Sequence, residues 1–137
     1  MDWLFTATSI IAFTAWAALA ALPRGPKLLS LVLYLGVGLL CLTYTVLFFI
    51  MFTNHPIIPD YSVEGLKPLF AADAGIVLGW THYLAFDLFI GLWIAKDADH
   101  KGFTRLVQLP FLFATLMAGP IGLLAWLVVR EKRARRQ

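Results

Sequence analysis

The sequence is poor in the residues that a water-soluble domain needs. Only 14% of its 137 residues are charged, whereas soluble domains carry about 25%. It holds three histidines and one cysteine, Cys41, so an internal disulfide bond is excluded. By contrast, 61% of the residues are hydrophobic and the mean hydropathy is +0.81. A soluble fold of this size could not bury so much apolar surface, and the composition predicts an all-α integral membrane protein.

Four apolar stretches are long enough to cross a bilayer, which takes about 20 residues for a hydrocarbon core of about 30 Å. They cover residues 3–22, 28–53, 75–95 and 109–129. The link at 23–26 is so short that we expect the first two helices to form a tight antiparallel hairpin. The chain 1–137 is therefore predicted to be a single domain of four transmembrane helices.

Two prolines fall within the fourth stretch. Pro110 fits the first turn of its helix. Pro120 lies in the middle, in Gly119-Pro120-Ile121-Gly122, where it removes a backbone hydrogen bond and clashes with the carbonyl of Leu116. We expect a kink of helix four at Pro120, with the freed carbonyl facing protein beside helix three.

The regions outside the apolar stretches are predicted to lie at the membrane surface. The connection 54–72 contains Pro56, Pro59, Gly65 and Pro68, so it cannot be helical throughout, and Asp73 after it is a candidate N-cap of helix three. The tail 130–137 carries five of the eleven basic residues. Such a tail rests on anionic headgroups, so the expected partner is membrane lipid and not nucleic acid. With four crossings the basic residues divide six against five between the two sides, which leaves the orientation open.

The third stretch carries two ionisable residues, His82 and Asp87, in an otherwise apolar segment. An aspartate near the centre of a spanning helix costs about 2.5–3.5 kcal/mol, so a small chain keeps it only if it is paired, wetted or used. At about 100° per residue, Asp87 shares a face with Asp73, Trp80 and Tyr83, while His82 lies about 140° away. His82 and Asp87 could meet only in a cavity that neighbouring helices help to form.

Each of these residues has more than one interpretation. Asp87 could form an interhelical hydrogen bond to a tyrosine or threonine, or act as a general acid or base. His82 could be a core histidine that donates to a backbone carbonyl, or a catalytic group. Together with His55 and Asp73 they could ligate iron, but no histidine pair has the spacing of a shared helical face, so no metal site is assigned.

Aromatic residues are abundant, with five Trp, four Tyr and eleven Phe. Helix two carries a stripe at helical spacing that we expect to pack against the other helices. The interior could then form a long aromatic-walled groove, which suits an elongated apolar ligand better than a hydrated ion. The stripe consists of Tyr34, Gly38, Cys41, Thr45, Phe48 and Phe52.

Three motifs together resemble the abscisic-acid-deficient-four-like family of small membrane proteins. They are Gly79-Trp80-Thr81-His82-Tyr83-Leu84-Ala85-Phe86-Asp87-Leu88-Phe89, then Ala95-Lys96-Asp97-Ala98, and Gly119-Pro120-Ile121-Gly122-Leu123. Plant members of that family are associated with making neoxanthin from violaxanthin in plastid membranes. This chain has no transit peptide and so resembles the bacterial members, a domain of unknown function, which implies a multi-pass protein of the bacterial inner membrane.

The resemblance implies a role on a carotenoid or related isoprenoid: isomerisation, epoxide opening or cleavage of a polyene. In a neoxanthin-synthase-like isomerase or oxidoreductase, His82 and Asp87 would be the acid and base. Alternatives are a non-catalytic carotenoid-binding or assembly subunit and a small proton-coupled transporter. The cofactor and self-association into a homo-oligomer are left open. The residues expected to line the site of a hydrophobic polyene are Asp73, Trp80, Tyr83, Gly119, Pro120 and Gly122.

Overall fold

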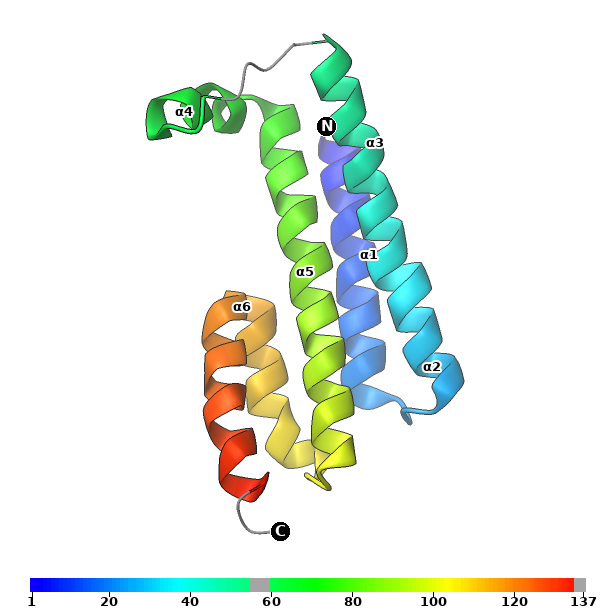
Figure 1. Cartoon of the computed structure of the whole chain (residues 1–137). Coiled ribbons are helices and arrows are strands. Elements are labelled where there is room, and N and C mark those ends of the chain that lie inside the picture. The colour runs from blue at the N-terminus through cyan, green and yellow to red at the C-terminus, as the bar shows by residue number, and fades with distance from the viewer. Residues whose placement is uncertain (55–59, 135–137) are drawn as a thin grey trace.

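The computed structural model describes residues 1–54 and 60–134, and these residues form helices and no strands (Figure 1). The all-helical class is thus confirmed for the described part. Segments α2, η1 and α3 follow one another without a break, and η1 is a π-helical stretch inside this long helix. The segments are α1 (Asp2–Ala21), α2 (Pro26–Leu31), η1 (Val32–Gly38), α3 (Leu39–Asn54), α4 (Val63–Ala71), α5 (Asp73–His100) and α6 (Arg105–Ala134).

By length and composition alone, four helices are candidate membrane spans: α1, the α2–η1–α3 helix, α5 and, if its break at Ala118 is disregarded, α6. They coincide with the four stretches identified from hydropathy. Between the first two, α1 ends at Ala21 and α2 begins at Pro26, which occupies the first helical turn. The two helices then run side by side in opposite directions (Figure 1).

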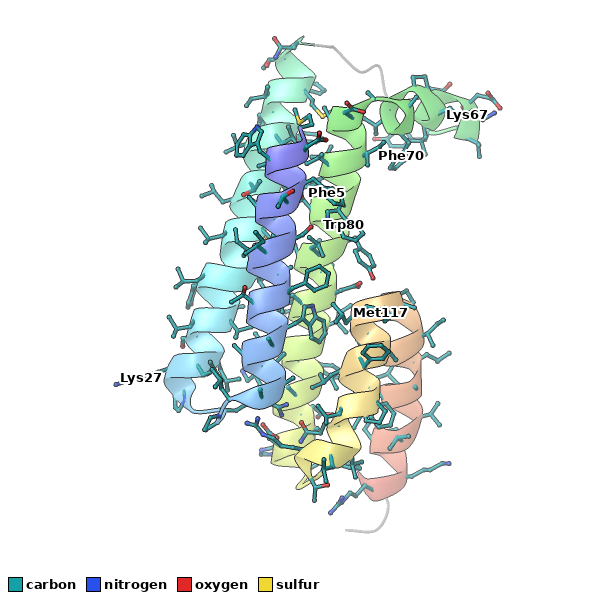
Figure 2. The ribbon with its side chains drawn as sticks, turned by 180° about the vertical axis from the view of Figure 1, so that it is seen from behind. Phe5, Lys27, Lys67, Phe70, Trp80 and Met117 are labelled. Carbon is teal, nitrogen blue, oxygen red and sulfur yellow. The ribbon has the colours of Figure 1, made fainter. Side chains whose placement is uncertain are left out.

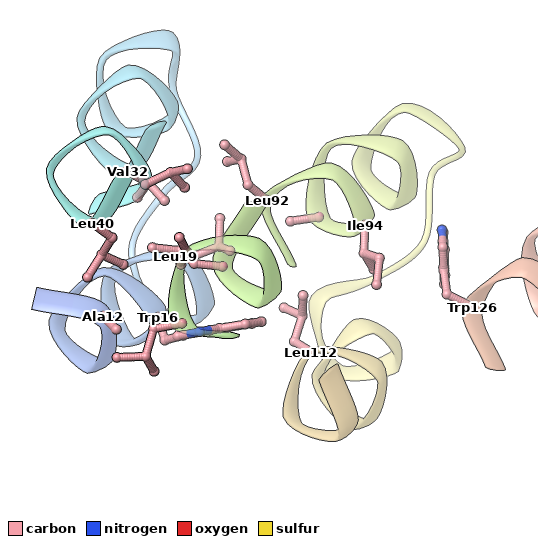
Figure 3. Packing of buried hydrophobic residues seen from close by; sticks show 14 of the residues in the cluster. Ala12, Trp16, Leu19, Val32, Leu40, Leu92, Ile94, Leu112 and Trp126 are labelled. Carbon is pink, nitrogen blue, oxygen red and sulfur yellow. The ribbon is translucent and has the colours of Figure 1, made fainter. Parts of the chain in front are cut away.

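Helix α5 is the centre of the bundle. In its apolar window 56% of the residues are buried, against 22–28% in the other three helices. It packs on α1, on η1 and α3, and on α6, and Figure 3 shows their buried side chains converging on it. Helix α1 approaches α5 closely at Gly91, where an added Cβ would lie 2.6 Å from a ring carbon of Trp16. Trp16 can therefore lie flat on α5 only because position 91 has no side chain.

Helix α6 is two antiparallel half-helices, with a non-helical residue, Ala118 (φ −154°, ψ 73°), between them. The rings of Phe111 and Trp126 are 5.4 Å apart, whereas 15 residues of straight helix would separate them by about 22 Å. Figure 1 shows the chain of α6 running to the level of the middle of α5 and then returning beside itself. Gly122 permits this return, because an added Cβ would lie 2.6 Å from the Cα of Thr115.

This hairpin corrects three predictions for the fourth stretch. Residues 109–129 do not form one crossing, because each half-helix of α6 is about 20–24 Å long and falls short of a hydrocarbon core of about 30 Å. The break lies at Ala118, two residues before Pro120, and the chain reverses there, as the contact of Phe111 with Trp126 shows (Figure 1). Since α6 begins at Arg105, Pro110 lies inside the first half-helix and not in its first turn.

The connection before α5 contains a short amphipathic helix, α4. Its N-cap is Ser62, whose Oγ accepts a hydrogen bond from the Gly65 amide at 3.0 Å. Figure 1 shows α4 lying roughly across the start of α5. The N-cap of α5 is Ala72, so Asp73 is its first helical residue and not the cap that we predicted. Residues 55–59, with His55, and 135–137 of the basic tail lie outside the described residues.

One end of the bundle, here called the charged end, holds ion pairs that join its segments. Arg24 follows α1, and its buried guanidinium binds Asp99 at 3.0 Å and also Gln108. Asp97 binds Arg130 at 2.7 Å and accepts a hydrogen bond from the Trp126 indole at 3.0 Å. These contacts fix the end of α1 and both half-helices of α6 to the end of α5. The start of α1 and the end of α3 lie at the opposite end (Figure 1).

Candidate functional site

The tip of the α6 hairpin meets the one carboxylate in the middle of α5. Asp87 is only 7% exposed, so it faces protein and not the surroundings, as the cost of a lipid-facing charge requires. A Cβ added at Gly119 would lie 2.8 Å from Asp87 Cγ, so only glycine lets the tip approach this closely. The second half-helix begins here, and its partial positive charge favours a carboxylate.

The Asp87 carboxylate is incompletely satisfied. Its Oδ2 is buried and has no hydrogen-bond partner among the described residues. A structural carboxylate that joins helices would be expected to accept hydrogen bonds from its neighbours. The interpretation of Asp87 as a hydrogen-bonded link between helices is therefore not supported by this geometry. A buried polar atom without a partner is instead a place where a ligand group or a proton can bind.

Tyr83, one helical turn before Asp87, fixes the other side of the tip. Its hydroxyl donates a hydrogen bond of 2.8 Å to the carbonyl of Leu116, at the end of the first half-helix. This carbonyl has lost its helical partner because the helix ends there. The prediction that the Leu116 carbonyl faces the bundle interior beside the third spanning helix is confirmed. Tyr83 thus binds the end of the first half-helix, and Asp87 packs against Gly119 at the start of the second.

An aromatic ladder continues from Tyr83 away from the hairpin tip. The rings of Tyr83 and Trp80 are stacked at 5.5 Å, and those of Trp80 and Phe5 at 5.1 Å. The Trp80 indole donates a hydrogen bond of 2.9 Å to the Ser9 hydroxyl on α1, which fixes its ring. Figure 2 shows Phe5 and Trp80 between Phe70 of α4 and Met117 at the tip of α6.

An apolar groove lies on the other side of the tip, between α1 and the first half-helix of α6. It has a volume of about 380 Å³ and ends at Leu116, whose carbonyl Tyr83 binds. The stretch of α1 from Ala20 at this groove to Phe5 at the ladder is about 22 Å long. Groove and ladder therefore follow one another along α1, with the Leu116 carbonyl that Tyr83 binds at the end of the groove. The residues lining the groove include Phe13, Trp16, Ala20, Leu112, Phe113 and Leu116.

His82 is not part of this arrangement. Its ring stacks on Phe86 at 4.7 Å and lies 5.5 Å from the ring of Tyr44 on α3, whereas Asp87 contacts α6. His82 is exposed, so it is not the core histidine that the sequence allowed. The helical wheel separated His82 from Asp87, and the neighbouring helices do not bring them together. A catalytic role for His82 stays a prediction that the geometry does not favour.

The stripe on the second apolar stretch also faces away from the bundle. Tyr34 is 68% exposed and Phe52 49%, and Cys41 and Thr45 are exposed too. The expectation that this stripe packs against the other helices is therefore wrong. Hydropathy could not reveal this, because a helix that faces lipid and a helix that faces protein are both apolar.

The remaining predicted residues divide between the tip and its surroundings. Gly119 touches Asp87, while Pro120 and Gly122 open the second half-helix behind it. Asp73 is exposed at the start of α5, 14 residues or about 21 Å of helix from Asp87. No group of three or more His, Cys, Asp or Glu in residues 1–54 and 60–134 could hold a metal ion.

Sequence reasoning missed the contribution of α1 to the site. Phe5 stacks on Trp80, Ser9 accepts a hydrogen bond from its indole, and Trp16 lines the groove. A signal was present, because a tryptophan N–H inside an apolar segment needs an acceptor and Ser9 is one of the few hydroxyls in the first stretch. Choosing between these hydroxyls required the packing of α1 against α5.

Four helices apolar enough to cross a bilayer, packed around a buried carboxylate, are consistent with a membrane protein. The sequence places it more closely. Residues 3–126 match the family model described as ABA DEFICIENT 4-like, and the chain belongs to this family. This confirms the family expected from the motifs around His82, Lys96 and Pro120. No curated protein and no solved structure shows a significant match.

Proposed function

We propose that this chain binds an elongated isoprenoid of the carotenoid class along the aromatic ladder and converts it by proton transfer at Asp87. The observation that carries the proposal is the buried Oδ2 of Asp87, which has no hydrogen-bond partner among the described residues and lies one helical turn from Tyr83. Family membership points to carotenoid- or abscisic-acid-related chemistry. Flat stacked rings are a suitable surface for a conjugated chain, and the ladder and the groove lie along about 22 Å of α1, a length that suits an elongated molecule.

The reaction that one carboxyl group supports best is an isomerisation. In the opening of an epoxide to an allenic alcohol, a proton leaves carbon and a proton reaches the epoxide oxygen, so the net change is zero. The Asp87 carboxylate accepts the proton from carbon, and the resulting acid delivers it to oxygen as the carbon–oxygen bond breaks. No oxidant, reductant or second acid is needed, and His82 has no part in this step.

The test is conversion of carotenoids in a pigment-producing host that expresses the full chain. Asp87→Asn keeps the shape and removes the titrating group, and we expect product formation to fall about 10²–10⁴-fold at normal protein level. The matched control is Asp60→Asn, which changes an exposed carboxylate that accepts a hydrogen bond from the Ser62 amide. Conversion by Asp87→Asn at the normal rate, or its loss in Asp60→Asn, would contradict the proposal.

A second set of variants distinguishes proton transfer by Asp87 from binding of the pigment. Trp80→Ala removes the central ring of the ladder and should reduce the pigment that copurifies with the protein. His82→Gln addresses the earlier expectation of an acid–base pair, because loss of conversion in this variant would mean that Asp87 does not act alone. The non-catalytic carotenoid-binding function is favoured if the wild type retains pigment but releases no altered product. The observation that favours this second, non-catalytic function is that Asp87 is only 7% exposed.

A further inference from the structure

A second groove lies at the charged end, on a part of α5 that the proposed function does not use. It has a volume of about 410 Å³. Its apolar part is formed by Leu33 of η1 and by Phe89, Leu92 and Trp93 of α5, and its polar part by Lys96 and His100. Lys96 and His100 are four residues apart and therefore share one face of α5. Along α5 the groove extends from Phe89 to His100, about 16 Å.

The polar part of this groove is cationic. Asp97 also lines it, but its carboxylate is bound by Arg130, at 2.7 Å to Oδ2 and 2.9 Å to Oδ1, and by Trp126. The ion pairs of the described residues include neither Lys96 nor His100. The Arg130 guanidinium also lies 5.5 Å from the centre of the Trp93 ring, which fixes the wall between the two parts. Lys96 is therefore available to an anion from outside the chain.

We propose that this groove, the Lys96 groove, binds an anionic phospholipid. Charge complementarity assigns its phosphate to Lys96 and His100, and the upper acyl chain lies on Trp93, Phe89 and Leu33. A free anion would leave the apolar part uncovered, and a zwitterionic lipid would leave Lys96 beside its own cationic group. The groove opens at the end of α5, where a helix that crosses a bilayer reaches the headgroups, and Trp93 lies between charge and chain as interfacial tryptophans do.

The test is titration of the purified full chain with phosphatidylglycerol, followed by native mass spectrometry. We expect Lys96→Gln to raise the dissociation constant of the first bound lipid about tenfold, because it removes a charge-assisted hydrogen bond. Lys96→Arg keeps the cation and should retain binding. The matched control is Lys27→Gln at the same end of the molecule but outside this groove, which should change the constant less than about threefold through screened charge alone.

Two further probes identify the ligand. Phosphatidylcholine with the same chains should bind about tenfold more weakly than phosphatidylglycerol, because its headgroup has no net charge. Inorganic phosphate at equal concentration should not displace the lipid, since it cannot cover the apolar part. Equal effects of Lys96→Gln and Lys27→Gln, equal binding of both lipids, or displacement by phosphate would each overturn the proposal. None of these outcomes depends on carotenoid conversion at Asp87.

Discussion

The return of α6 on itself can be tested by a distance that differs many-fold between a hairpin and a straight helix. The Arg133 guanidinium lies 4.5 Å from the centre of the Phe103 ring. If Arg105–Ala134 were one straight helix, residues 105 and 133 would be about 42 Å apart, beyond the reach of any short crosslinker. Phe103→Cys with Arg133→Cys, in a Cys41→Ser background that removes the native thiol, should therefore be joined by a bifunctional maleimide of about 10 Å.

Mass spectrometry of the intact chain reads the result. One linker bound at both ends indicates the hairpin, and two singly attached linkers indicate a straight helix. The matched control pair is Lys67→Cys with Arg133→Cys, because α4 and the charged end lie at opposite ends of the bundle (Figure 1). Lys67 and Arg133 are exposed and Phe103 is half-buried, so both thiols of the test pair must be shown to react before the two pairs are compared. Absence of the bridged product in the test pair, with both thiols reactive, would refute the fold of α6.

Two further predictions concern stability and are measured by thermal unfolding in detergent. Gly119→Ala forces a methyl group against Asp87 and should destabilise the fold by about 1–3 kcal/mol. In the control Gly38→Ala an added Cβ makes only ordinary contacts, so this change should be neutral or stabilising by about 0.5–1 kcal/mol. Equal effects of the two substitutions would show that the tip of α6 does not touch Asp87. Arg24→Gln removes the cation that joins α1 to Asp99 and Gln108 and should lower the free energy of unfolding by about 1–3 kcal/mol. The control Lys67→Gln, in the exposed pair with Glu64, should change it by less than about 0.5 kcal/mol. Unchanged stability of Arg24→Gln would contradict the joining role of the charged end.

Helical periodicity was sufficient to predict one side of the site. Trp80, Tyr83 and Asp87 recur at intervals of three, four and seven residues, so any regular helix places them on one face, and α5 does so. The same wheel placed His82 elsewhere, which the structure bears out. The sequence does not show whether the face of α5 with Asp87 or the face with His82 packs against protein, because α5 is otherwise apolar on all sides in this region.

The hairpin could not be predicted from hydropathy. A stretch of 21 apolar residues satisfies the requirement of a single crossing whether it is straight or folded in half. The sequence contains a signal in Gly119-Pro120-Ile121-Gly122, but proline disrupts only one turn of a helix, so this motif by itself predicts a kink. The reversal depends on contacts from distant segments, namely Tyr83 on Leu116 and Asp97 on Trp126 and Arg130. Contacts between residues so far apart in the chain cannot be predicted from the sequence around the motif alone.

The reversal of α6 also redistributes charge between the two ends of the molecule. Of the eleven basic residues, Arg135 and Arg136 lie beyond the described part, and eight of the other nine belong to the charged end, with Lys67 at the opposite end (Figure 2). The near-even division that four crossings would give becomes a strong asymmetry with three. Under the positive-inside rule, we expect a chain so divided to insert with the charged end in the cytoplasm and with Met1 and α4 on the outer face. Folding one helix in half thereby gives the basic residues an asymmetry that a bundle of four crossings would not have. The eight are Arg24, Lys27, Lys96, Lys101, Arg105, Arg130, Lys132 and Arg133.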